Sequence, residues 1–204
     1  MGNFLSDILL RYVGNNDVKN FEQVMEISEA DNRTIIIEGI DETSGTVADQ
    51  LIRFWNKVDE LSETPVEERK PIKIYINSPG GSLVSTLTII DAIKLSKTPV
   101  WTINIGMAYS GGFFIFINGH KRITYPNSSF LYHEGSTGVD GDASKFQDYA
   151  DFYKRQRVVL KKIVLENTKI TPEQYKDHIK DDWWLLSDEA LELGVCDEIS
   201  SELI

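Results

Sequence analysis

Apolar residues along the chain follow two alternating patterns, short β-branched or aromatic runs and longer stretches with helical spacing. The short runs predict strands over residues 34–37, 72–76, 99–105, 123–125 and 130–132. The longer stretches predict helices over residues 46–58, 83–95, 113–117, 145–167 and 172–180, and a last helix that Ser187 caps and Gly194 ends. This alternation of strand and helix predicts an α/β fold with right-handed crossovers.

The first twenty residues differ in pattern from the rest of the chain. Residues 4–13 have the spacing of a short amphipathic helix, which Gly14-Asn15-Asn16 ends. We interpret residues 1–20 as an N-terminal segment, either a propeptide or a docking element. Residues 21–204 then form a single domain, a size that can bury a sizeable core.

Composition and charge narrow the classes of function. The formal net charge is −11, which disfavours a long contact with the phosphates of a nucleic acid. The single cysteine, Cys196, excludes an internal disulfide and fits a reducing compartment, and we expect its side chain to be buried. No apolar run reaches the ~20 residues that span a bilayer, and no signal peptide is recognisable. We therefore expect a cytoplasmic protein that binds neither nucleic acid nor membrane.

Three short motifs each follow a predicted strand. Gly80-Gly81 follows the second strand, Ser110 the third, and His133 the strand over residues 130–132. In open α/β sheets, ligands bind beyond the carboxyl ends of the strands. The pattern therefore places a glycine-rich turn, a serine and a histidine at one edge of the sheet. Each motif alone is equally typical of an ordinary turn or of a closely packed helix.

The serine lies in the heptapeptide Gly106-Met107-Ala108-Tyr109-Ser110-Gly111-Gly112, at the start of a predicted helix. A serine hydroxyl becomes a nucleophile when an imidazole accepts its proton. Among the three histidines of the sequence, His133 is the best base, because it leaves a strand on the same side of the sheet. We expect His120, in a Gly-His-Lys-Arg turn, to be solvated, and His178 to pair locally with the aspartate four positions on.

The other parts of such a site are a carboxylate and two oxyanion donors. Asp182 is attractive because two tryptophans follow it and predict partial burial, and Asp181 is its rival. Spacing alone does not separate the two. The N–H groups of Gly81 and Gly111 are candidate oxyanion donors, since glycine lets the backbone approach a substrate carbonyl closely.

Three segments together resemble the proteolytic subunits of the ATP-dependent Clp protease, the ClpP type within the crotonase-like superfamily. The segments are Tyr75-Ile76-Asn77-Ser78-Pro79-Gly80-Gly81-Ser82, the heptapeptide around Ser110, and Pro126-Asn127-Ser128 followed by His133. The similarity covers residues 34–199 with the motifs in order. It implies a crotonase-like fold of stacked ββα units with a protruding long helix.

The resemblance also assigns roles to individual residues. Ser110 matches the nucleophile of the family, His133 its base and Asp182 its third triad member. Gly81 and Gly111 match its oxyanion donors. The implied activity is that of a serine endopeptidase that needs no metal or cofactor.

The substrate and the partners follow from the same resemblance. An unfolded polypeptide or peptide would lie extended, as an added strand, against Gly80, Ser82, Gly135 and Gly138. The family implies a homo-oligomer of heptameric rings stacked in pairs, supplied with substrate by an AAA+ unfoldase.

Two departures from the family lie next to the triad positions. Glu134-Gly135 follows His133, where the family has Gln-Pro. Gly111 stands where the family has methionine after the serine, and we expect this glycine to open the adjacent pocket.

A third departure concerns the contact between rings. In the family an acidic residue early in the long helix pairs with an arginine before the catalytic aspartate, whereas Lys145 and Asp181 stand here with opposite signs. We expect these two residues to form a swapped ring–ring ion pair. Lys145→Asp should therefore split double rings into single ones in size-exclusion chromatography, and adding Asp181→Lys should restore them. Double rings that persist in the single variant would contradict the pairing.

Two other classes of function remain open at this stage. An acyl-CoA enzyme of the same superfamily also polarises a carbonyl with two N–H groups, and would need no serine nucleophile. A non-catalytic ring or assembly subunit would keep the oligomer surface alone. The presence of all three triad residues favours the peptidase.

Overall fold

The computed structural model describes residues 33–135 and 143–204. The helix expected over residues 4–13 and the glycine expected at the substrate, Gly138, lie outside this part of the chain. No helix in the described part is long and apolar enough to cross a membrane.

The described residues form a mostly parallel sheet, which confirms the α/β class. Its strands are β1 (Thr34–Ile37), β2 (Ile72–Ser78), β3 (Val100–Tyr109), β4 (Lys121–Thr124), β5 (Ser129–Tyr132), β6 (Trp183–Leu186) and β7 (Glu198–Ile199). The order is β1-β2-β3-β4-β7, and only the pairing of β5 with β6 is antiparallel. Strand β3 is long enough to pair with β4 along its first half and with β5 along its second. The carboxyl end of β5 therefore lies beside that of β3.

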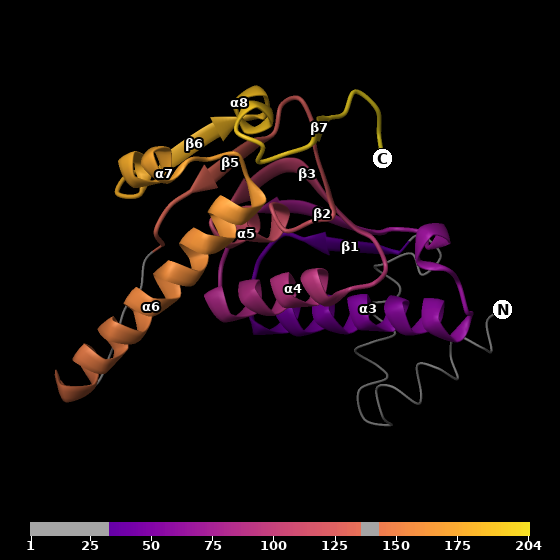
Figure 1. Cartoon of the computed structure of the whole chain (residues 1–204), viewed down its shortest axis with the longest axis horizontal. Helices are drawn as coiled ribbons and strands as arrows, with labels where there is room; N and C mark the ends of the chain where they lie inside the picture. Colours follow the sequence, from indigo (N-terminus) through magenta and orange to yellow (C-terminus); the bar gives the residue numbers. More distant parts are fainter. Residues whose placement is uncertain (1–32, 136–142) are drawn as a thin grey trace.

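Helices surround this sheet, and one of them projects from it. They are α3 (Glu42–Leu61), α4 (Leu83–Leu95), α5 (Gly111–Phe116), α6 (Ala143–Asn167), α7 (Pro172–His178) and α8 (Ser187–Glu192), with a short 3₁₀ turn at Val66–Glu68. Helices α3 and α4 run side by side along one face of the sheet, while α6 extends away from the body (Figure 1). The protruding long helix expected from the resemblance is α6.

Alternation of apolar residues along the strands builds the core. In β2 the residues Ile72, Ile74 and Ile76 are fully buried, while the residues between them are partly exposed. The apolar helix α5 is buried along its whole length. Because this helix is packed on all sides, the turn that precedes it is held in place by the core.

Two expectations about element boundaries are wrong, and two short strands have no counterpart among the expected elements. Helix α3 begins one turn before Thr46, because Asp41 forms a capping box with Ser44. The strands β6 and β7 are too short to leave a clear pattern. Ser187 is not a cap but the first residue of α8, and its hydroxyl donates to the carbonyl oxygen of Tyr125 at 2.7 Å.

Candidate active site

The ends of β2, β3 and β5 meet at one pocket of about 620 Å³. Its polar and glycine lining includes Gly81, Ser82, Ser110, Gly111, His133, Glu134 and Gly135. Its other lining is largely apolar, with Val84 and Phe114 from α4 and α5, and Phe152 and Leu160 from α6. The structure thus brings the three sequence motifs to one cavity.

Ser110 occupies the sharp turn between β3 and α5. Its φ of 52° and ψ of −117° lie in a region that residues with a side chain rarely adopt. Two backbone bonds hold this conformation: the Ser110 N–H donates to the Leu131 carbonyl at 2.9 Å, and the Ser110 carbonyl accepts from the Phe114 N–H at 3.2 Å. A strained, firmly held backbone at a cavity wall is typical of functional sites.

The amides of Gly81 and Gly111 lie next to each other at the same wall. Ile40 bridges the Gly81 turn: its N–H donates to the Gly80 carbonyl at 3.2 Å, and its carbonyl accepts from the Ser82 N–H at 2.7 Å. A Cβ atom at Gly111 would lie 3.6 Å from the Gly81 nitrogen. Neither amide donates to an acceptor within the described residues, so both N–H groups can bind an anionic oxygen.

Gly111 does not open an additional pocket, and that expectation is wrong. A Cβ atom there would lie 2.4 Å from Thr86 Oγ1 and 3.1 Å from Ile40 Cδ1. The space that a side chain would need is already filled. Glycine at this position is therefore a packing requirement.

His133 follows β5, and its side chain is 30% exposed. Its Nδ1 lies 4.0 Å from Asp182 Oδ1, which is too long for a hydrogen bond. No hydrogen bond links His133 to Ser110 among the residues that the structure describes. Side chains of this kind are often loosely arranged in the absence of substrate and tighten in the reacting complex.

The geometry separates the two candidate carboxylates. Asp182 makes the contact with His133, whereas Asp181 makes no such contact in the described part of the chain. The expected partial burial of Asp182 is wrong, because its side chain is 60% exposed. The tryptophans after it belong to β6, an edge strand whose residues alternate between core and solvent.

The other two histidines have structural contacts. His120 is exposed as expected, yet its Nδ1 accepts the Val100 N–H at 3.0 Å and so secures the start of β3. His178 stacks on Trp183, with ring centroids 4.1 Å apart. Its expected pairing with Asp182 is absent from the described contacts.

The remaining predicted residues are placed as follows. Gly80 has φ 102°, and a Cβ atom there would lie 2.7 Å from that of Ser110. Ser82 lines the pocket and also caps α4. Gly135, with φ 78°, lies on the rim. Lys145 and Asp181, expected at a ring contact, are both exposed.

Sequence reasoning missed the contact of two residues of α6, Tyr153 and Arg157, with this site. Glu134, next to the histidine, forms an ion pair with Arg157. The Tyr153 hydroxyl donates to the Glu134 carbonyl at 2.8 Å. The spacing of Tyr153 and Arg157 indicates that they share one helix face, but no pattern in the sequence brings that face to Glu134.

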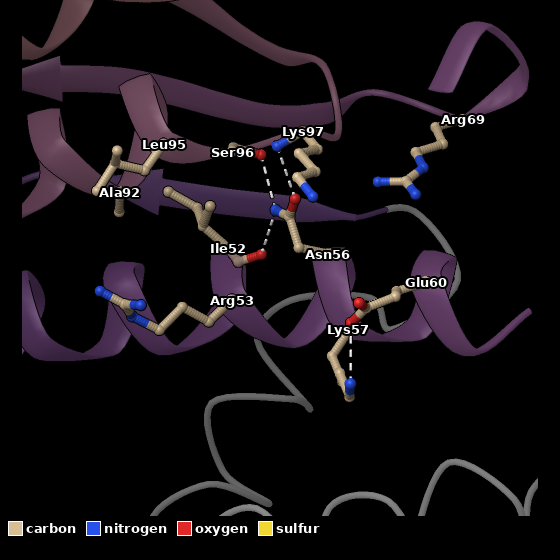
Figure 2. A pocket seen from close by; sticks show the side chains of 10 residues that line it. All are labelled: Ile52, Arg53, Asn56, Lys57, Glu60, Arg69, Ala92, Leu95, Ser96 and Lys97. Atoms are coloured by element: carbon tan, nitrogen blue, oxygen red, sulfur yellow. Dashed lines mark hydrogen bonds and ion pairs between the residues drawn. The ribbon is translucent and has the colours of Figure 1, made fainter. Parts of the chain in front are cut away.

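A second hollow, of about 300 Å³, lies between α3 and the turn after α4 (Figure 2). The Asn56 amide fills its centre: its nitrogen donates to Ile52 O and Ser96 Oγ, and its oxygen accepts the N–H groups of Lys97 and Thr98. These bonds join the two helices. The hydroxyl of Ser96 in this hollow is itself engaged, since it accepts from Asn56 and donates to the Thr98 carbonyl oxygen at 2.6 Å.

Several known proteins are similar to this chain in amino-acid sequence. A model of the Clp protease family matches residues 22–202. The protein "ATP-dependent Clp protease proteolytic subunit 2" of Treponema denticola is 31% identical over 170 residues, which cover 82% of each chain. Proteins of the same name are 29% identical in Treponema pallidum, over 81% of this chain and 80% of the relative, and 34% identical in Tropheryma whipplei, over 67% and 77%. The matched region includes the whole pocket described above.

Proposed function

The chain belongs to the Clp protease family, and on that premise we propose that it is a serine endopeptidase in which Ser110, His133 and Asp182 form the triad. The observation that carries the proposal is the shared pocket. It holds a strained serine, two unpaired amides and a histidine with a carboxylate 4.0 Å away. This combination matches the needs of acyl transfer, and no metal is required.

The chemistry proceeds in two stages. Ser110 Oγ attacks the scissile carbonyl while His133 accepts its proton, and the N–H groups of Gly81 and Gly111 bind the oxyanion. His133 then gives the proton to the leaving amine, and water hydrolyses the acyl-enzyme with the same base. Asp182 orients the imidazole, for which it moves from 4.0 Å to hydrogen-bond distance.

The proposed substrate is an unfolded polypeptide or peptide bound in extended form. Ser82 and Gly135 line its path, Gly80 packs directly behind Ser110, and the apolar wall from α5 and α6 receives a side chain of the substrate. The sequence has no Gly-x-x-x-x-Gly-Lys-Ser loop, so ATP-driven unfolding belongs to a separate AAA+ partner.

We also propose that the protein works in the cytoplasm as stacked heptameric rings. Large apolar side chains on α6 and β6 are exposed, which supports their burial in an assembly. They are Phe146, Phe152, Val158, Val159, Trp184 and Leu186. Lys145 and Asp181 are also exposed, as a contact between rings requires.

Labelling with a fluorophosphonate tests the nucleophile. We expect the reagent to form a covalent adduct on Ser110, mapped by mass spectrometry, because only an activated serine reacts with it. Ser62→Ala, an exposed serine at the end of α3, is the matched control and should label like the original protein. An adduct on another residue would contradict Ser110 as the nucleophile. The absence of any adduct, together with hydrolysis of acyl-CoA thioesters, would favour the acyl-CoA enzyme, which uses the same two amides.

A further inference from the structure

Helix α6 holds the segment after His133 by two contacts that lie one helical turn apart. The Tyr153 hydroxyl donates to the Glu134 carbonyl oxygen at 2.8 Å, and the Arg157 guanidinium forms an ion pair with the Glu134 carboxylate. Tyr153 and Arg157 are four residues apart and therefore share one helix face. Backbone and side chain of Glu134 are thus both fixed by α6.

Glu134 lines the pocket, whereas Arg157 lies behind it, outside the lining. The side chains of the pair are 31% and 40% exposed, so their charges are only partly screened by water. Among the charged groups that the structure describes, the one in recorded contact with the imidazole is Asp182, just before β6, at 4.0 Å. Glu134 is the neighbour of His133 along the chain, and Tyr153 and Arg157 of α6 reach Glu134. The hydroxyl of Tyr132, on β5, is instead bonded to that of Tyr175. The Arg157 guanidinium therefore balances the carboxylate that lies next to the histidine in the chain.

We propose that Arg157 is a positioning residue that acts on His133 through Glu134, fixing both the place of the imidazole and the charge around it. This inference rests on the proposed peptidase function. An unbalanced carboxylate beside an imidazole favours the protonated ring, which cannot accept the serine proton. With Glu134 held by Arg157, the negative charge of Glu134 is balanced and the backbone next to His133 is fixed.

Arg157→Gln tests the charge component. We expect the acid limb of the pH profile of kcat/KM, measured with a small fluorogenic peptide, to move up by about 0.5–1 pH unit. On the acid side of the limb kcat/KM should therefore fall by roughly 3–10-fold, and on its alkaline side it should be unchanged. The fluorophosphonate labelling rate of Ser110 should follow the same profile. The fold should persist, because half-exposed ion pairs contribute little to stability.

Lys154→Gln is the matched control. It removes the same charge from a position three residues earlier in α6, where Lys154 pairs with Asp151 at the surface. Its pH profile should superimpose on that of the original protein. Adding Glu134→Gln to Arg157→Gln should return the acid limb to its original place, because both charges are then absent.

Tyr153→Phe and Arg157→Lys separate position from charge. Removing the hydroxyl should lower kcat by about 2–5-fold without moving the acid limb. Arg157→Lys keeps the charge and should leave the acid limb in place.

An Arg157→Gln profile that superimposes on that of Lys154→Gln overturns the inference, as does an acid limb that moves equally in Arg157→Lys. If the original protein neither cleaves peptides nor labels at Ser110, the peptidase function itself fails, and the two failures are thus distinguished.

Discussion

Replacement of Ser110 by alanine is expected to lower kcat for peptide cleavage by about 10⁴–10⁶-fold. In the proposed mechanism this hydroxyl forms the acyl-enzyme, and Ser110 directly precedes Gly111, whose amide is one of the two proposed oxyanion donors. The fold should be retained, since the bonds of Ser110 to Leu131 and Phe114 are made by its backbone. Steady-state cleavage of a fluorogenic peptide, with the thermal midpoint as a check on folding, measures both quantities.

His133→Ala and the double variant with Ser110→Ala test whether the serine and the histidine act together in one mechanism. His133→Ala should cost about as much as Ser110→Ala, and the double variant should be no slower than either alone, because residues that act as a unit lose their effect together. The turnover of the peptide by Ser62→Ala should equal that of the original protein. A Ser110→Ala protein that keeps more than a hundredth of the turnover, or losses that multiply in the double variant, would rule out a shared serine–histidine mechanism.

The groups at the carboxyl ends of the strands could largely be predicted, because short stretches of sequence identify both the strands and the motifs that follow them. Each of the motifs at Gly80-Gly81, Ser110 and His133 follows a run whose periodicity identifies a buried strand, and the crossover rule then puts the strand ends together. Helix α4 has the predicted bounds, since apolar spacing and the cap at Ser82 agree. The start of α3 was misplaced by a turn because Asp41 and Thr46 are both acceptable caps in sequence, and only the reciprocal bond from Ser44 distinguishes them.

The predictions that failed depend on contacts between distant segments. Asp182 is exposed although tryptophans follow it, because β6 pairs with β5 at the edge of the sheet and turns its residues alternately outward. The role of Gly111 depends on Thr86, a residue of another helix that fills the space beside it. The partner of Glu134 lies 23 residues along the chain, on a helix whose direction no local pattern determines.

The proposed reacting groups, Ser110, His133 and the two glycine amides, stand on turns that follow buried strands. The core therefore fixes their positions, and local sequence patterns predict them. Two parts of the site are held less firmly: the 4.0 Å contact between His133 and Asp182, and the contacts of α6 with Glu134. Both join segments that are distant in the sequence and meet only through tertiary contacts. Regulation and adaptation to a substrate are expected in these segments, because the energy that holds them is small.

Replacing Gly81 by alanine is expected to lower kcat by at least 10²–10³-fold. At this residue φ is 151°, and a Cβ atom would lie 2.0 Å from the carbonyl oxygen of Ile40. That oxygen accepts the Ser82 N–H at 2.7 Å, so the added methyl group must push the turn away from its bridge. The Gly81 amide then leaves its place beside Gly111, and one of the two proposed oxyanion donors is lost. Steady-state kinetics at saturating peptide reports the loss.

Gly39→Ala is the matched control, since nothing lies within 4 Å of a Cβ atom at that position. It should change kcat by less than about twofold and leave the thermal midpoint almost unchanged. Gly81→Ala strains the backbone as well, and should lower the free energy of unfolding by roughly 1–3 kcal/mol. The two effects separate through fluorophosphonate labelling below the midpoint: a folded protein without its oxyanion donor labels slowly, because the reagent also develops charge on an oxygen at this position. A folded Gly81→Ala protein that cleaves and labels at the original rate would mean that the glycine pair is only a tight turn between β2 and α4, and that the anion is bound elsewhere.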